Sequence, residues 1–149
     1  MRVMDAVRRN GVSVATDTTL AAAAELMESA GVGTLAVLDG DELVGIVTDR
    51  DLVRRGLARR LDHSARIDGV MSSPVVTIDA EADLRESFRI FSENAIRRLA
   101  VLEDGRFVGV LSVDDLLVDV AADLSELLRP VTAEVLFPHR DPAVPVTTS

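Results

Sequence analysis

The sequence contains no cysteine, tryptophan or tyrosine, and all 16 of its basic residues are arginine. Without cysteine the chain forms no disulfide bonds and offers no thiolate ligand to a metal ion. Without lysine, catalysis through a Schiff base is excluded. Aromatic residues make up 3% of the chain and hydrophobic residues 48%. The core must therefore be built from Val, Leu, Ile and Ala.

The sequence also has no apolar run that approaches the length needed to cross a bilayer. Near the N-terminus, Asp5, Arg8 and Arg9 stand where a signal peptide needs its apolar stretch. We therefore expect a cytoplasmic protein without membrane association. The formal net charge of −9 disfavours nucleic acid as a partner, because phosphates are repelled at long range.

The chain contains an internal repeat with an offset of 64 residues. Residues 12–58 align with residues 76–122 without a gap. The segment TLAVLDGDELVGIVTDRDL, which starts at Thr34, matches RLAVLEDGRFVGVLSVDDL, which starts at Arg98. Such self-similarity predicts two copies of one structural unit.

Both copies predict the same order of elements. A short strand (12–14; 75–78) precedes a helix that begins at Thr19 or Asp83, residue types that cap helix N-termini. In the second helix Leu84, Phe88 and Phe91 recur with the spacing of one buried face. Two apolar strands follow (35–38 and 43–47; 99–102 and 107–111), and Gly-containing turns join them. A closing helix runs from 49 to about 60 and from 113 to about 128.

The predicted fold class is therefore α+β, with tandem β-α-β-β-α repeats related by a pseudo-twofold axis. One such unit is too small to bury both faces of its sheet, so two must share a core. Packing of this kind leaves paired clefts between the copies, where ligands commonly bind. Five segments follow: a lead-in with a short helix at 3–9 (1–11), repeat one (12–60), a linker (61–74), repeat two (75–128) and a tail (129–149). Residues 67–71 are expected to be a second lead-in.

The closing helix of repeat two carries more apolar positions than one buried stripe requires. We expect the surplus face to form a homodimer, although packing under the tail is the alternative. In that tail, residues 131–137 are predicted to be extended, with disorder near Ser149. The positions concerned are Leu116, Leu117, Val120, Ala121, Leu124, Leu127 and Leu128.

A hydroxyl residue and a carboxylate recur with the repeat after each third strand. GIVTDRD supplies Thr48 and Asp51, and GVLSVDD supplies Ser112 and Asp115. A helix start offers free amides to an anion, and a nearby carboxylate accepts both hydroxyls of a ribose. The same spacing is close to a capping box, which has a purely structural role. The sequence alone leaves both interpretations open.

These motifs resemble the paired cystathionine-β-synthase (CBS) domains, or Bateman module, over roughly residues 3–128. The most specific segments are GIVTDRDL, GVLSVDDL and the RRLAV sequence from Arg97. The resemblance implies an adenosine ligand, with Asp51 and Asp115 on ribose hydroxyls and Thr48 and Ser112 on ribose or phosphate. It places the first strands around the adenine and an arginine on phosphate. The residues implied for these last two roles are Val12, Val14, Val76, Ile78, Arg97 and Arg98.

The sequence departs from the family pattern in two places. Ala36 and Ala100 replace a proline that is common in the second strand, and Gly33 and Thr34 stand where repeat two has its arginine pair. Because repeat one lacks these cations, we expect the two sites to be unequal, with one of them occupied preferentially.

Other combinations of residues give weaker signals. Neighbouring acids such as Asp114 and Asp115 point apart on a helix, which argues against magnesium binding or acid–base catalysis. His63 and His139 lack acidic partners at ligand spacing, and neither a catalytic triad nor a phosphate-binding glycine loop is present. We therefore predict no metal site, no required cofactor and no enzymatic activity, and a metal-dependent hydrolase is the least favoured hypothesis.

The function predicted from the sequence is regulatory sensing. AMP, ADP, ATP, S-adenosylmethionine or a dinucleotide would bind in the cleft between the repeats and control another chain. The alternative is a dimerisation or protein-interaction module that keeps the fold and binds no nucleotide.

Overall fold

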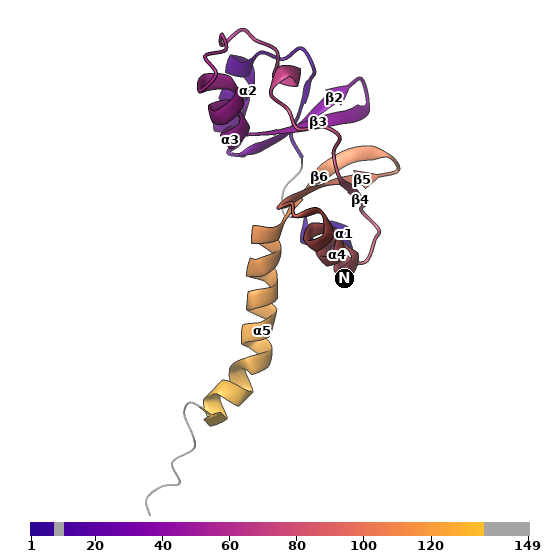
Figure 1. Ribbon diagram of the computed structural model, residues 1–149. Helices are drawn as coiled ribbons and strands as arrows, with labels where there is room; N and C mark the ends of the chain where they lie inside the picture. Colours follow the sequence, from indigo (N-terminus) through magenta and orange to yellow (C-terminus); the bar gives the residue numbers. More distant parts are fainter. Residues whose placement is uncertain (8–10, 136–149) are drawn as a thin grey trace, which may run out of the picture. The chain divides into compact units, whose positions relative to one another are not determined.

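The computed structural model describes residues 1–7 and 11–135, with side-chain surroundings described as far as Pro130. Residues 1–115 form one compact unit that contains the sheets of both repeats, and the chain from Leu116 onward forms a second. The first unit holds two three-stranded sheets, ordered β1-β2-β3 and β4-β5-β6 (Figure 1). The α+β class and the tandem repeat are thereby confirmed.

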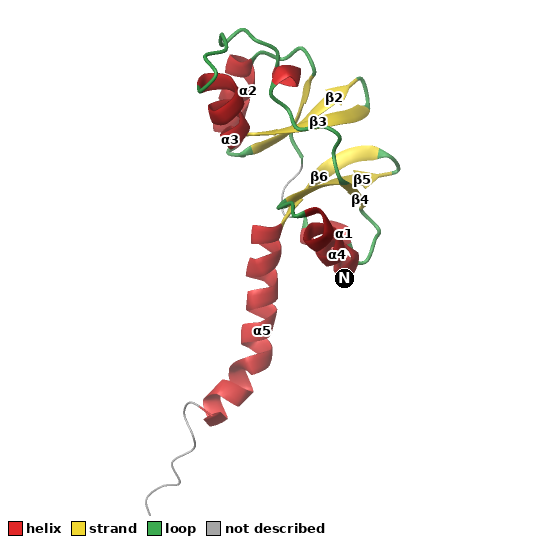
Figure 2. Ribbon diagram, viewed as in Figure 1, coloured by secondary structure: helices red, strands yellow, loops and turns green. Residues whose placement is uncertain are grey.

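The two repeats have the same element order (Figure 2). Repeat one comprises β1 (Ser13–Ala15), α2 (Leu20–Ala30), β2 (Thr34–Asp39), β3 (Glu42–Thr48), α3 (Asp49–Asp51) and a π-helical segment η1 (Leu52–Leu57). Repeat two comprises β4 (Thr77–Asp79), α4 (Leu84–Asn94), β5 (Arg98–Glu103), β6 (Arg106–Ser112) and α5 (Val113–Val135). The lead-in segments are α1 (Val3–Ala6) and the 3-10 helix η2 (Ile67–Gly69).

Strand pairing also repeats with the same offset. β1 is parallel to β2 with Val14 opposite Val37, and β4 is parallel to β5 with Ile78 opposite Val101. The β2–β3 and β5–β6 pairs are antiparallel, and each contains a register shift at the matched position. Identical registers require that the same side chains of each repeat face the same side of its sheet.

The predicted helix starts are confirmed. The Thr19 hydroxyl accepts a hydrogen bond from the amide of Ala22 at 3.1 Å. The Asp83 carboxylate accepts one from the amide of Arg85 at 2.8 Å. In the β5–β6 hairpin, Asp104 and Gly105 both have positive φ, which matches the twist of a two-residue turn.

Each repeat buries the same set of positions. Ser87 is the one buried polar residue of the described chain, and its hydroxyl donates to the carbonyl oxygen of Leu84. The buried positions of repeat one are Leu20, Ala23, Met27, Leu35, Val37 and Val47, and their counterparts are Leu84, Ser87, Phe91, Leu99, Val101 and Leu111.

The lead-in segments cross between the repeats. The segment that precedes repeat one packs on repeat two, where the Val3 amide donates to Ala82 O at 2.9 Å and the Leu84 amide donates to Met1 O at 2.9 Å. The segment that precedes repeat two packs on repeat one, where the Ile67 amide donates to Thr18 O at 2.7 Å. Val3 and Ile67 are both fully buried. Each core is therefore completed by a segment that leads into the other repeat.

The predicted pattern of helix α4 is wrong in one respect. Phe88 is 45% exposed, whereas Ser87 is fully buried beside Leu84 and Phe91. The buried face therefore follows spacings of three and four residues through Ser87, as helical geometry requires. The small Ser87, and not the larger apolar Phe88, therefore belongs to the buried face.

Three predicted boundaries also change. The lead-in helix ends at Ala6, so it is shorter than predicted, and residues 8–10 lie outside the described part. The closing segment of repeat one has one turn of α-helix and then π-helical geometry. The extended structure predicted from 131 is wrong as far as Val135, because α5 continues through Pro130. A proline removes one helical hydrogen bond but does not always end the helix. Residues 136–137 and Ser149 lie outside the described part of the chain.

Candidate functional site

Two cavities open between the repeats of the first unit, and each combines residues of both. The Asp115 pocket has a volume of about 380 Å³ and the Asp51 pocket about 320 Å³, within the size range of small-molecule sites. The Asp115 pocket is lined by Gly11, Val12, Gly31, Val32, Gly33, Thr34, Arg98, Val110, Ser112, Asp114 and Asp115. The Asp51 pocket is lined by Ile46, Thr48, Asp51, Ser72, Pro74, Val75, Val76, Ile96, Arg97 and Arg98.

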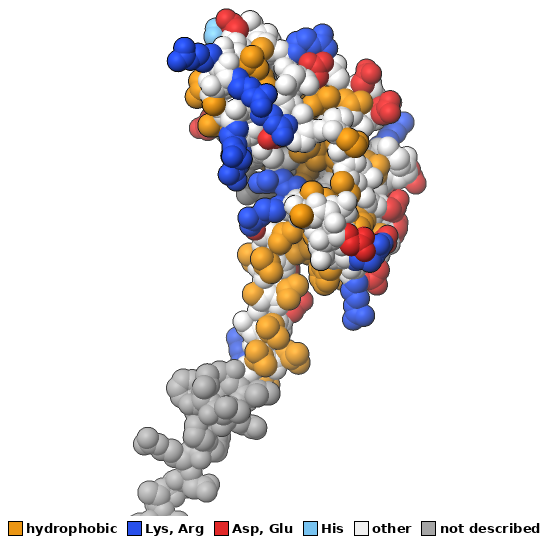
Figure 3. Space-filling model, in the orientation of Figure 1, with side chains coloured by type: hydrophobic (Ala, Val, Ile, Leu, Met, Phe, Trp, Pro, Cys, Tyr) orange, Lys and Arg blue, Asp and Glu red, His pale blue; other side chains and the backbone are white. Residues whose placement is uncertain are grey.

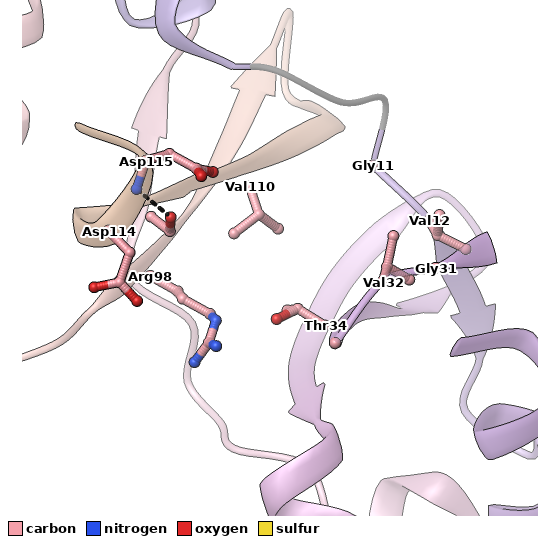
Figure 4. A pocket seen from close by; sticks show the side chains of 11 residues that line it. Gly11, Val12, Gly31, Val32, Thr34, Arg98, Val110, Asp114 and Asp115 are labelled. Atoms are coloured by element: carbon pink, nitrogen blue, oxygen red, sulfur yellow. Dashed lines mark hydrogen bonds between the residues drawn. The ribbon is translucent and has the colours of Figure 1, made fainter. Parts of the chain in front are cut away.

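In the Asp115 pocket, the end of β6 and the first turn of α5 supply the polar groups. The Ser112 hydroxyl accepts a hydrogen bond from the Asp115 amide at 3.0 Å, as Figure 4 shows. Within the described residues, the Asp115 carboxylate makes no hydrogen bond or ion pair. It is a half-buried acceptor beside a cavity, so both oxygens are available to ligand hydroxyls.

In the Asp51 pocket, the matched residues form a complete capping box. The Thr48 hydroxyl accepts from the Asp51 amide at 3.1 Å, and the Thr48 amide donates to Asp51 Oδ2 at 2.9 Å. The structural interpretation of the motif therefore applies to Asp51, whose carboxylate already accepts one main-chain hydrogen bond. The two motifs have the same spacing but differ in how their carboxylates are used.

Two adjacent arginines at the start of β5 supply the positive charge. Arg98 lines both pockets, and Arg97 lines the Asp51 pocket. Arg97 donates to Asp114 Oδ1 at 2.9 Å, and both side chains are mostly exposed. Within the described part of the chain, the Arg98 guanidinium has no hydrogen bond or ion pair. In Figure 4 it extends toward Thr34 across the pocket.

The wall of the Asp115 pocket contains a close contact that only glycine permits. The Gly11 amide donates to Val108 O at 3.1 Å. A Cβ atom at Gly11 would lie 2.3 Å from the Phe107 ring and 2.9 Å from Gly109 Cα. The segment leading into repeat one therefore lies directly against β6 of repeat two.

The wall of the Asp51 pocket is fixed by a second crossing segment. Ser72 and Ile46 exchange two main-chain hydrogen bonds, at 2.8 and 3.1 Å. The Arg55 guanidinium donates to the carbonyl oxygens of Val70 and Met71 at 3.3 Å and to the Ser72 hydroxyl at 3.2 Å. Arg55 thus positions the wall without facing the cavity.

The structure brings eight of the ten predicted site residues to the two pockets. Val12 lies with Ser112, Asp115 and Arg98, whereas Val76 lies with Thr48, Asp51, Arg97 and Arg98. Val14 and Ile78 line neither pocket: Val14 packs against the core of repeat one, and Ile78 is 5% exposed. The pocket residues that the sequence did not indicate include Gly11, Thr34, Val110, Ser72 and Ile96. Of these, Gly11 and Ser72 lie on the crossing segments, which the repeat pattern does not predict.

The described residues contain no group of three or more His, Asp or Glu side chains that would hold a metal ion. His63 is 86% exposed and lies 3.7 Å from Asp62, and His139 lies outside the described part. Within that part, no helix is long and apolar enough to cross a membrane.

Comparisons with known proteins give the family. The model of the CBS domain matches residues 3–58 and 67–122. The chain is 36% identical over 96 residues to the uncharacterized Bacillus subtilis protein YlbB; the match covers 63% of this chain and 65% of that protein. It is 35% identical over 100 residues to Hypoxic response protein 1 of Mycobacterium tuberculosis, a match that covers 66% of this chain and 70% of that one.

Solved structures agree. A crystal structure of Hypoxic Response Protein I with two coordinated zinc ions has 33% identity and a TM-score of 0.67, and it covers 78% of this chain and 96% of that one. A CBS domain protein of Pyrobaculum aerophilum complexed with AMP has 25% identity and a TM-score of 0.70, over 82% of this chain and 99% of that one. None of these names describes a catalytic activity. With both repeats matched and the same fold in both neighbours, the chain belongs to the CBS domain family as a tandem pair.

Proposed function

We propose that the pair of repeats is a regulatory module that binds an adenosine nucleotide in the pockets between them. The observation that carries this proposal is the Asp115 pocket. There one cavity is lined by a hydroxyl together with a carboxylate and an arginine that have no hydrogen bond or ion pair to the residues that the structure describes. A carboxylate can accept the two hydroxyls of a ribose, an arginine can bind phosphate in bidentate fashion, and Val12 and Val110 offer an apolar surface to a base.

The Asp51 pocket supports the same proposal with a different balance of charge. Its lining carries two arginines and one acid, whereas that of the Asp115 pocket carries one arginine and two acids. The additional arginine therefore favours phosphate in the Asp51 pocket. In the Asp115 pocket, the carboxylate accepts no hydrogen bond from the described residues, so it is more readily available to ribose hydroxyls. Residues 74–76 and Ile96 supply the apolar surface that an adenine requires. The AMP bound to the P. aerophilum protein is consistent with this ligand class.

Ligand titration tests the proposal. Isothermal calorimetry with AMP, ADP, ATP, S-adenosylmethionine and a dinucleotide should detect binding of at least one compound. Asp115→Ala should weaken binding in the Asp115 pocket about 10-fold or more, because a charge-assisted hydrogen bond is lost at each ribose hydroxyl, and it should leave binding in the Asp51 pocket unchanged. Glu103→Ala, at the far end of β5 and outside both pockets, is the control that should leave affinity unchanged. Absence of heat and of thermal stabilisation with every compound at millimolar concentration would refute nucleotide sensing.

That negative result would favour a second candidate function, a protein-interaction module that binds no nucleotide. Two observations support it: the Asp51 carboxylate is already engaged in a capping box, and the second unit exposes a large apolar surface. In either case the proposed module has no catalytic role and acts on another protein in the cytoplasm.

We further propose that α5 forms a homodimer. Leu117, Val120, Leu124 and Leu127 are 60%, 44%, 50% and 72% exposed, and Figure 3 shows orange side chains along this helix. Their spacing alternates between three and four residues, which is the pattern of a two-helix seam. A second copy of α5 offers a matching apolar stripe.

Sedimentation or light scattering at micromolar concentration tests this assembly. The wild-type chain should have twice the monomer mass, and Leu124→Glu should reduce it to the monomer mass because two charges would be buried at the seam. Asp123→Glu, at the adjacent position, preserves charge and should not change the mass. A wild-type monomer would contradict the dimer.

A further inference from the structure

The two pockets share a single side chain, that of Arg98. It stands at the first position of β5 and is the one described residue that lines both pockets. From this strand it reaches toward Thr34 on the Asp115 side (Figure 4). Its guanidinium has no hydrogen bond or ion pair to any residue that the structure describes, so it is available to a ligand in either cavity.

The other charges cannot replace it in the Asp115 pocket. Apart from Arg98, the charged residues of that lining are Asp114 and Asp115, both acidic. The Asp51 pocket has a second cation in Arg97, although Arg97 also donates to Asp114 at 2.9 Å. A nucleotide phosphate carries about −1.5 to −2 charges near neutral pH. Among the described residues that line the Asp115 pocket, Arg98 is the one cation that can compensate that charge.

We propose that Arg98 makes phosphate binding in the two pockets mutually antagonistic, an inference that rests on the proposed nucleotide-binding function. A phosphate in the Asp51 pocket, where Arg97 also contributes, draws the Arg98 guanidinium to that side. The described lining of the Asp115 pocket is then left with two carboxylates and without its arginine, so a second phosphate is bound weakly. Adenosine has no phosphate and does not need Arg98, so it binds to each pocket independently. The module therefore binds two nucleosides equally readily but only one nucleotide tightly.

The internal repeat shows how this sharing arises. Arg98 aligns with Thr34, and Arg97 aligns with Gly33. Thr34 and Gly33 both line the Asp115 pocket, beside Arg98. An arginine at position 34 would therefore give the Asp115 pocket a cation of its own. The matched strand position in repeat two already carries arginine, so the substitution suits the backbone.

Stepwise calorimetry with the full chain separates coupling from a simple difference between two sites. Asp51→Ala and Asp115→Ala each leave one pocket intact, and they give its intrinsic affinity for AMP and for adenosine. In the wild-type chain, the first AMP should bind with the affinity of the Asp115→Ala chain. The second should bind about 10-fold or more weakly than it binds to the Asp51→Ala chain. With adenosine, both wild-type steps should equal the intrinsic affinities.

Two substitutions identify the cause. In the Thr34→Arg chain, the second AMP molecule should bind with the intrinsic affinity of the Asp115 pocket, so the difference seen in the wild-type chain should disappear. Arg98→Gln should weaken AMP in both pockets and adenosine in neither. Arg97→Gln is the matched control, since its effect should be confined to the Asp51 pocket.

Two AMP molecules bound at their intrinsic affinities would overturn the antagonism while leaving the proposed function intact. A gap that persists with adenosine, or in the Thr34→Arg chain, would also overturn it. Failure of both AMP and adenosine to bind would instead remove the proposed function itself, together with this inference.

Discussion

At matched positions of the two repeats, Leu35 and Leu99 are both fully buried, and so are Val37 and Val101. At the pockets the matched positions differ: Gly33 and Thr34 stand where repeat two has Arg97 and Arg98. The Asp51 carboxylate accepts a main-chain hydrogen bond, whereas the carboxylate of Asp115 has no protein partner in the described chain. The repeats thus keep the residues that hold the sheets and vary those that line the pockets.

The closing segments differ in the same sense. In repeat one the chain turns through the π-helical η1, where Gly56 is buried and a Cβ atom would lie 3.3 Å from Leu20. In repeat two the matched residue, Val120, is 44% exposed on the 23-residue helix α5. Close packing of η1 therefore belongs to repeat one, and an exposed apolar helix surface belongs to repeat two.

The largest effect is expected where the repeats are most alike, at the crossing lead-ins. Ile67→Ala should destabilise the protein by about 2–5 kcal/mol, because it leaves a cavity in the core of repeat one. Val3→Ala should cost less, since it removes fewer buried carbon atoms at about 0.8 kcal/mol each. Urea unfolding of both variants measures the difference.

Leu61→Ala, at a linker position that is 42% exposed, serves as the control and should change stability by less than about 0.5 kcal/mol. If Val3→Ala had as little effect as this control, α1 would not be part of the core of repeat two. The equivalence of the two lead-ins would then be lost.

A smaller effect should distinguish the two carboxylates. In ligand-free protein, Asp51→Ala removes the hydrogen bond from the Thr48 amide and should cost about 1 kcal/mol. Asp115→Ala breaks no hydrogen bond of the described structure and should cost less than about 0.5 kcal/mol. Thermal unfolding without nucleotide compares them. Equal losses would mean that Asp115 also caps its helix, and the contrast between the pockets would disappear.

The internal repeat made the fold predictable from the sequence. Aligned copies indicated the order of the strands, and Thr19 and Asp83 marked the helix starts because they cap them. The site was predictable only in part. Gly11 and Ser72 reach the pockets on segments that cross to the other repeat, and strand patterns carry no information about such crossings.

The same limit explains the residues that were missed. Gly11 has no chemistry that would mark it, and its importance comes from the nearby Phe107 ring, which is remote in sequence. Whether Asp51 caps a helix or faces a ligand depends on a rotation of its side chain, which the spacing of the motif leaves free. Proline disfavours the interior of a helix, but the residues on either side of Pro130 are helical, so α5 is longer than predicted.

The smallest effect concerns the ion pairs of Arg2, which connect the first lead-in to repeat two. The Arg2 amide donates to Asp5 Oδ2 at 3.0 Å, and the Arg2 guanidinium bonds both Asp5 and Glu81. The main-chain hydrogen bond, followed by the guanidinium, lowers the pKa of Asp5 below its ordinary value of 3.8. A carboxyl with a lowered pKa contributes stability above its unfolded-state pKa and loses it as pH falls through the folded-state value.

Asp5→Asn should therefore lower stability slightly near neutral pH, and this difference from wild type should vanish in acid below the ordinary pKa of Asp5. Glu81 and Asp5 raise the pKa of Arg2 above its ordinary value, so Arg2 stays charged throughout. Denaturant unfolding of both proteins at neutral and acid pH measures the change. Repeat one has Arg66 beside Asp68 at the corresponding lead-in, where Arg66 Nη2 lies 2.9 Å from Asp68 Oδ2. Asp68→Asn is the matched variant. If the stability lost on Asp5→Asn did not depend on pH, packing alone would hold α1 in place.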